Sequence, residues 1–213
     1  MTRTPTPKRE SRNWTLHTYS KISLADAENR LGFRIGDVKA VSVERMLAGF
    51  KPEGLGGDKT KEEVYKGIIQ YIKIEGYPTE AVPEFNESNV SDLVFVIISP
   101  ILFDLICNTE RNLRLQREKD IISVDGETGG KEEFVVIDRV SVSEGRFVMV
   151  VGGKRSSIGQ AMKQCLLSLK DMGDNNGGGE VYGFVTTGES WRMKYLCKVT
   201  STPIPLNLLG LVK

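Results

Sequence analysis

The sequence predicts an α/β fold in which a mixed central sheet is flanked by helices. In the second half of the chain, apolar residues recur with a helical period in some segments, and short β-branched runs lie between those segments. The predicted order is helix, three strands, helix and two strands, which is typical of a sheet covered by helices on its faces. A length of 213 residues with 39% hydrophobic residues is enough for one packed domain and a smaller appended region.

The composition divides the chain into four segments. Residues 1–12 form a tail rich in proline, threonine and basic residues, which we expect to be disordered. Residues 13–84 are expected to be mostly helical, residues 85–196 to form the α/β domain, and residues 197–213 to form an irregular tail. The N-terminus lacks the apolar core of a secretory signal, so we expect an intracellular protein, cytoplasmic or nuclear.

In the N-terminal region the helix signals are local. Ser23–Leu31 is a candidate helix capped by its first residue, and Val41–Gly49 is a weaker one. Glycines and a proline predict a loop over residues 51–58. A capping-box pattern at Thr60–Glu63 precedes a predicted amphipathic helix over Lys61–Ile74.

The α/β domain is expected to begin with two helices. An apolar helix starts near Val90, and Ser99-Pro100 is typical of a second helix start. The polar stretch Asn108–Asp120 is not assigned, and Ile121–Val124 is a short strand candidate. The later predicted elements are strands Phe134–Ile137 and Phe147–Val151 joined by a turn at Glu144-Gly145, helix Ser157–Met172, and strands Val181–Thr187 and Trp191–Leu196.

Histidine and cysteine usage narrows the possible chemistry. The single histidine, His17, excludes sites built on paired histidines, and three cysteines without CxxC spacing give no disulfide framework or zinc site. Cys107 and Cys165 lie in apolar stretches and are expected to be buried, inert thiols. The net charge is +1, so a nucleic-acid surface would have to be a local patch.

A membrane partner is not expected. The apolar run from Leu93 to Ile106 is interrupted by Ser99, Pro100 and Asp104, which makes it a poor transmembrane span. The oligomeric state is left open.

Asp138 and Lys154 form the first candidate site. Each falls at or just past the end of a predicted strand, and we expect the two side chains to reach the same edge of the sheet. A carboxylate can hold Mg²⁺, and a lysine can orient a water molecule and offset phosphate charge. Two residues in surface loops would give the same pattern, and without further context that interpretation is favoured.

The sequence around Asp138 and Lys154 favours a functional site over two unrelated surface residues. The stretches Phe147–Arg155, Gly159–Leu166, Asn175–Gly177 and Val181–Met193 resemble the PD-(D/E)xK nuclease superfamily, and within it a set of uncharacterised fungal proteins. The resemblance covers about half of the chain. It implies a restriction-endonuclease-like fold and Mg²⁺-dependent hydrolysis of nucleic acid.

The resemblance also implies roles for individual residues. Asp138 and Glu87 would be metal ligands, Lys154 the motif lysine, and Gln164 or its neighbour Gln160 a glutamine facing the site. Glu87 can equally be a favourable acid in the first turn of a helix.

One departure from the family pattern stands out. The motif acid would occupy position 152, where this chain has Gly152, and the nearest acid, Glu144, is expected to be solvated at a hairpin tip. We therefore expect a nuclease-like protein whose activity is weakened or lost. The alternatives are a non-catalytic module that binds nucleic acid or protein, and a small structural domain. Trp191 and Arg192 could contact nucleic acid, but a core position is favoured for the tryptophan.

Overall fold

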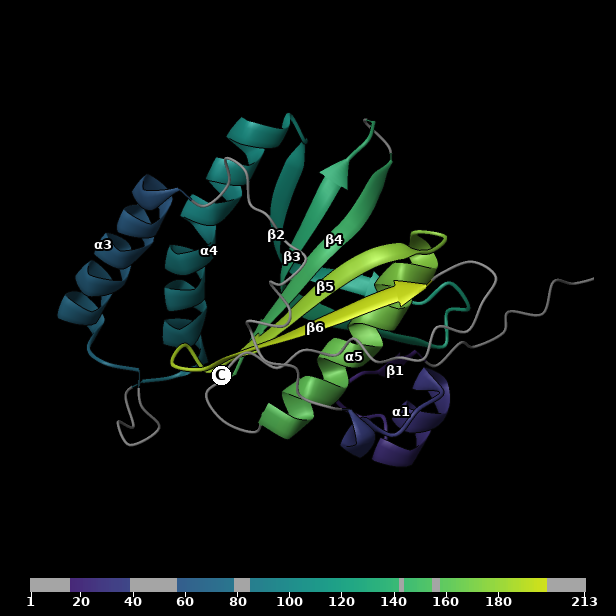
Figure 1. Ribbon diagram of the computed structural model, residues 1–213. Coiled ribbons are helices and arrows are strands. Elements are labelled where there is room, and N and C mark those ends of the chain that lie inside the picture. The colour runs from purple at the N-terminus through teal and green to yellow at the C-terminus, as the bar shows by residue number, and fades with distance from the viewer. Residues whose placement is uncertain (1–15, 39–56, 79–84, 142–143, 155–157, 199–213) are drawn as a thin grey trace, which may run out of the picture.

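The computed structural model describes residues 16–38, 57–78, 85–141, 144–154 and 158–198. These residues form a mixed α/β structure with a six-stranded mixed sheet and four α-helices (Figure 1). The predicted α/β class with a mixed central sheet is therefore confirmed.

The sheet is built around one long antiparallel meander. Strands β2, β3 and β4 are antiparallel, β5 is parallel to β4, and β6 is antiparallel to β5. The short strand β1 runs parallel to the start of β3. The strands are β1 (His17–Thr18), β2 (Leu113–Ile122), β3 (Thr128–Arg139), β4 (Gly145–Gly153), β5 (Gly179–Thr186) and β6 (Trp191–Lys198).

The helices lie on both faces of this sheet (Figure 1). α5 and α1 are on one face, whereas α4 and α3 are on the other. The helical elements are α1 (Leu24–Leu31), the short 3₁₀ helix η1 (Ile35–Asp37), α3 (Asp58–Glu75), α4 (Glu87–Thr109) and α5 (Ile158–Asn175).

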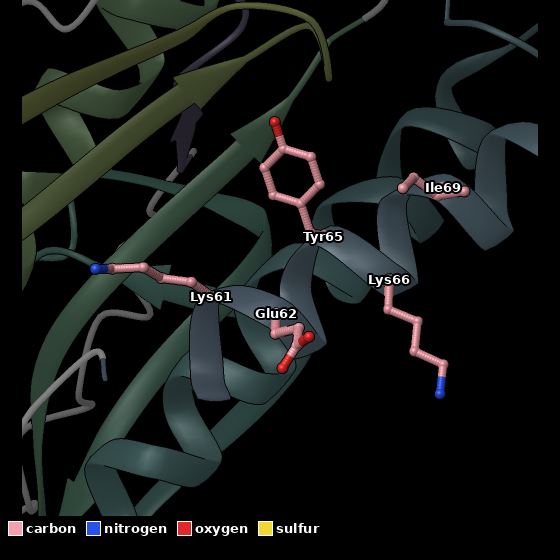
Figure 2. Close-up of a pocket in the computed structure, with 5 residues that line it drawn as sticks. All are labelled: Lys61, Glu62, Tyr65, Lys66 and Ile69. Carbon is pink, nitrogen blue, oxygen red and sulfur yellow. The ribbon is translucent and has the colours of Figure 1, made fainter. Parts of the chain in front are cut away.

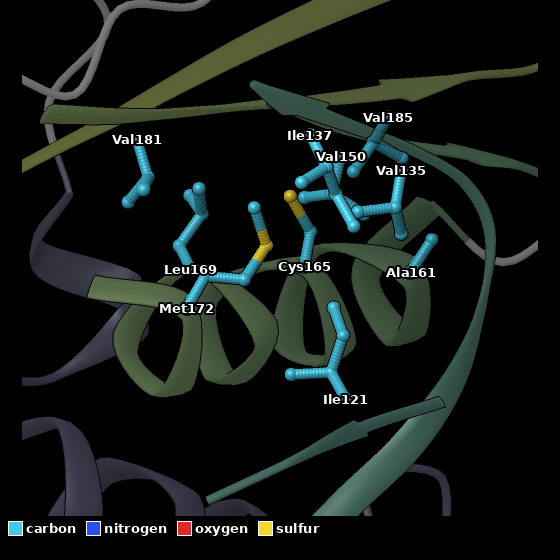
Figure 3. Packing of buried hydrophobic residues seen from close by; sticks show 10 residues of the cluster. All are labelled: Ile121, Val135, Ile137, Val150, Ala161, Cys165, Leu169, Met172, Val181 and Val185. Carbon is cyan, nitrogen blue, oxygen red and sulfur yellow. The ribbon is translucent and has the colours of Figure 1, made fainter. Parts of the chain in front are cut away.

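The larger core lies between α5 and the sheet (Figure 3). Ala161, Cys165 and Leu169 recur every four residues, so they share the helix face that packs on the strands. Their partners include Val135 of β3 and Val150 of β4, both about 1% exposed or less. This periodicity is the feature that predicted α5 from the sequence.

The opposite face of the sheet is covered by α4. Val90 and Val94 are buried against Phe134 of β3 and Val151 of β4. α3 packs behind α4, where the Tyr71 hydroxyl donates a hydrogen bond of 2.6 Å to the Asn89 carbonyl oxygen.

The N-terminal region shares these cores. Tyr19 and Ala27 are buried with Leu167 of α5, and the Tyr19 hydroxyl donates to Asp171 of α5 at 2.9 Å. The described parts of residues 13–84 therefore pack on both sides of the sheet.

Three elements differ from the prediction. α4 is one continuous helix that contains Pro100. Its residues before the proline pack on the sheet, and this packing offsets the single backbone hydrogen bond that the proline removes. β2 begins at Leu113, inside the unassigned polar stretch. Among the described strands it pairs only with β3, and a strand at a sheet edge need not be apolar. α3 begins at Asp58, so Thr60 lies inside the helix and is not its cap. The predictions for residues 1–12, 41–49, Ser157 and the tail beyond Lys198 lie outside the described residues.

Two further observations concern exposure. Cys107 is exposed, so the expectation that it is buried is wrong, whereas Cys165 is buried as predicted. The uninterrupted α4 is long and apolar enough to cross a membrane by length and composition. This is weak evidence, because core helices meet the same criterion, and the N-terminal half of α4 packs on the sheet.

Candidate functional site

A fork in the sheet brings the charged residues together. On one edge, β3 pairs with β1 up to Gly129 and with β4 only from Phe134 onward. Residues 130–133 of β3 therefore lie between two diverging neighbours, without a ladder partner on that edge among the described strands. β4 continues beside β5 instead, with Gly153 opposite Thr186. We call this gap the fork.

Lys154 enters the fork from the end of β4. Its backbone N–H donates to the Thr186 carbonyl oxygen at 2.9 Å, which holds the strand end beside β5. Its Nζ lies 3.5 Å from a carboxylate oxygen of Glu87, in the first turn of α4. The Lys154 side chain is 36% exposed and that of Glu87 is 60% exposed, so this ion pair faces solvent. The structure thus brings together two residues that the sequence singled out.

Glu133 is the second acid at the fork. Its carboxylate accepts a hydrogen bond of 2.7 Å from the backbone N–H of Gly153. Burial raises the pKa of Glu133, while this hydrogen bond and the charge of Lys154 oppose the shift. A Cβ atom at position 153 would lie 2.9 Å from the Glu133 carboxylate and 3.2 Å from Val90, so the close approach requires glycine.

Glu132 lies on the other face of the sheet, toward α5. It is 8% exposed, and its carboxyl group is hydrogen-bonded to the Ser168 hydroxyl of α5. Burial raises the pKa of Glu132 to about 7, and the Ser168 hydrogen bond and the charge of Lys154 oppose this rise. Lys154 is therefore in the electrostatic field of three carboxyl groups: Glu87, Glu132 and Glu133.

Gly152 leaves room in this arrangement. Val150 packs against α5 and Val151 packs against α4. Because successive side chains of a strand point to opposite faces, a side chain at position 152 would point toward α5. A Cβ atom built at Gly152 meets nothing within 4 Å, and its φ is not in the left-handed region. The position where the family motif has an acid can thus accept a side chain.

Asp138 does not belong to this group, and the expectation that it shares a cleft with Lys154 is wrong. It pairs with Arg146 at the start of β4, eight residues before Lys154, which is roughly 25 Å away at about 3.3 Å per residue. Its carboxylate instead accepts a hydrogen bond of 2.9 Å from the Arg111 side chain. In an antiparallel hairpin the end of one strand meets the beginning of the next, so two strand ends lie far apart.

The two glutamines of α5 have different surroundings. Gln160 donates from Nε2 to the Ser20 carbonyl oxygen at 2.9 Å, which links the helix to the N-terminal segment. Gln164 is half-buried and lies one helical turn before Ser168, on the helix face that approaches Glu132. Trp191 is half-buried against the α4 core and contacts the ring of Phe184, in agreement with the favoured core position.

The described residues do not fit the Mg²⁺ site that the resemblance implied. Mg²⁺ needs oxygen ligands in near-octahedral geometry. Among the residues with described positions, no three His, Cys, Asp or Glu side chains are placed to hold a metal ion. Of the two expected ligands, Glu87 is paired with Lys154 and Asp138 lies at the far end of the sheet. We assign no metal ligand.

A hollow on the outer face of α3 is a weaker candidate. Figure 2 shows that its side chains spread apart from a single helix and do not converge on one point. Its lining residues are Lys61, Glu62, Tyr65, Lys66 and Ile69.

The acids at the fork were missed in the sequence. Glu132 and Glu133 interrupt the apolar alternation of β3 and resemble solvated residues at a strand start. The available signal was hairpin register: if the two strands are antiparallel, the residues opposite Gly152 and Gly153 are the ones just before Phe134.

Comparison with known proteins adds no assignment: no protein-family model matches the chain, and no curated protein matches it. The family resemblance thus depends on the residues and their arrangement.

The buried carboxyl group of Glu132 should make stability depend on pH. Its pKa is about 7 in the folded chain against an ordinary 4.5, so the folded state binds more protons between these values. Stability should therefore fall as pH rises from about 4.5 to 7, and Glu132→Gln should remove this slope. At pH 8 we expect the variant to be more stable by up to about 3 kcal/mol. Urea unfolding at several pH values measures this, with Glu62→Gln on α3 as the exposed control; a variant less stable than the native chain at pH 8 would contradict it.

Proposed function

We propose that this chain is a PD-(D/E)xK nuclease-like protein that binds nucleic acid at the fork and has weak or no Mg²⁺-dependent cleavage activity. The observation that carries the proposal is the convergence of Glu133 and Lys154, from adjacent strands, with Glu87 of the preceding helix. The family pattern has an acid on one strand, a lysine at the end of the next and a glutamate on the helix before them.

The order of the elements supports the same proposal. A helix, an antiparallel three-stranded meander, a second helix and a strand parallel to the third follow one another in the chain. The resemblance implies such a restriction-endonuclease-like core. Gln164 on the following helix also agrees with the family pattern.

The residues at the fork favour a role in binding nucleic acid over a role in cleaving it. Gly152 supplies no side-chain ligand, and the described residues hold no group of acids placed for a metal ion. Lys154 is partly exposed, so a phosphate can reach its ammonium group in competition with Glu87. A non-catalytic nucleic-acid-binding module is thus the form of the proposal that the geometry supports best; a protein-binding module is the alternative.

Replacing Lys154 tests the binding. Lys154→Met should weaken binding of a short fluorescein-labelled oligonucleotide by about tenfold. It should also reduce the slope of log K against log salt concentration by about one, because one phosphate contact is lost. Fluorescence anisotropy with EDTA present measures both quantities. Lys61→Met, which removes an exposed lysine on α3, is the matched control. Equal effects of the two variants, or no binding by the native chain, would contradict the proposal.

A further inference from the structure

The hydroxyl of Ser168 lies between two acceptors. Its Oγ is within hydrogen-bonding distance of the Glu132 carboxyl group and 3.0 Å from the Gln164 carbonyl oxygen. A serine hydroxyl carries one hydrogen and can donate to only one of these groups. If Glu132 carries a proton, it donates to Ser168, Ser168 donates to Gln164, and all three groups are satisfied.

The surroundings of Glu132 are also short of positive charge. Lys154 is the cation that acts on Glu132, and it is shared, because it also acts on Glu133 and is paired with Glu87. Arg117 acts on Glu133 as a second cation. A proton on Glu132 reduces this imbalance. The groups that face Glu132 from the packed elements are Glu133, Lys154, Cys165, Ser168, Tyr19 and, as its cross-strand partner on β2, Lys119.

We propose that Glu132 holds a proton in the resting site and that loss of this proton lowers the affinity of the fork for nucleic-acid phosphate. The inference rests on the proposed function, because Lys154 is taken as the phosphate contact. With Glu132 neutral, Glu87 and Glu133 are the carboxylates of the described residues that oppose the Lys154 charge. With Glu132 ionised, a third negative charge acts on Lys154 and repels the phosphate.

The negative charge of ionised Glu132 determines how oligonucleotide binding should change with pH. Binding of an oligonucleotide should weaken by about tenfold as pH rises through neutrality, beyond the change seen in a variant that cannot ionise. Glu132→Gln keeps an amide that can donate to Ser168, so it imitates the protonated state. This variant should retain at alkaline pH the affinity that the native chain shows in mild acid.

The coupling can be measured without nucleic acid. In protein labelled with ¹³C-lysine, the Lys154 Cε resonance is assigned by its loss in Lys154→Arg and followed from about pH 5.5 to 8.5. It should show an inflection near neutrality that is absent in Glu132→Gln. Glu133→Gln removes a neighbouring negative charge and should move the inflection to lower pH.

Oligonucleotide anisotropy over the same pH range distinguishes failure of the inference about the Glu132 proton from failure of the proposed nucleic-acid binding. An inflection that persists in Glu132→Gln, or no inflection in the native chain, would overturn the inference. A normal inflection with no oligonucleotide binding at any pH would overturn the proposed function instead. If binding weakens equally with pH in the native chain and in Glu132→Gln, ionisation of Glu132 does not control phosphate affinity and the inference is overturned.

Discussion

Arg30→Met should lower the free energy of unfolding by about 3–5 kcal/mol, the cost of leaving a buried charge without its partner. Arg30 donates to the Asp171 carboxylate at 3.1 Å, and the Asp171 side chain is fully buried. It also contacts both carboxylate oxygens of Asp125, at 3.0 and 3.2 Å. The variant would leave Asp171 with only the neutral donors Tyr19 and Thr128.

Urea unfolding measures this loss of stability. Two further variants test whether the loss comes from the uncompensated charge of Asp171. Lys131→Met breaks an ion pair with Glu118 whose side chains are 57% and 74% exposed, so it should cost less than about 1 kcal/mol. Adding Asp171→Asn to Arg30→Met should recover part of the stability, because the uncompensated charge is removed. A loss below about 1 kcal/mol for Arg30→Met would show that the ion pair does not hold the N-terminal segment on α5.

If the fork retains the rest of a nuclease site, Gly152→Glu should raise Mg²⁺-dependent cleavage of DNA by about a hundredfold over the native chain, which should show little or none. The reason is that an acid returns to the motif position beside Lys154, and the open space at Gly152 accepts its side chain. Adding Lys154→Ala should abolish the gain. Release of labelled fragments with and without Mg²⁺ gives the rates.

Gly152→Gln is the matched control, since it fills the same space without a charge. Equal activity of the Gln and Glu variants would attribute the gain to packing. Rapid cleavage by the native chain would show that another acid already substitutes. No cleavage by Gly152→Glu, in a folded variant that still binds an oligonucleotide, would favour the binding module without recoverable chemistry.

The fold was predictable where one side of an element is buried. α5 and α3 have regular apolar spacing, and β4 and β5 are β-branched runs, so their type was clear. β2 was largely missed, because an edge strand exposes much of its length. The break predicted at Pro100 did not occur, since packing of α4 outweighs a local signal.

The candidate site was only half predictable. Lys154 was found because strand ends are visible in the sequence, and Glu87 because the family resemblance implies a glutamate on the preceding helix. Asp138 was wrong because strand pairing direction was not applied to the hairpin, and the same rule would have indicated Glu133. The burial of Glu132 could not have been predicted, since it depends on a contact with Ser168, 36 positions away.

The most direct test of the fork as the binding site is a backbone-amide NMR map. The ¹⁵N-labelled native chain is titrated with a short oligonucleotide in EDTA, so that no metal-dependent step contributes. We expect the largest shift changes at Glu133, Gly152, Gly153 and Lys154, with little change at Asp138. Changes centred on Asp138 and Arg146, at the opposite end of the β3–β4 pair, would contradict the assignment of the site to the fork.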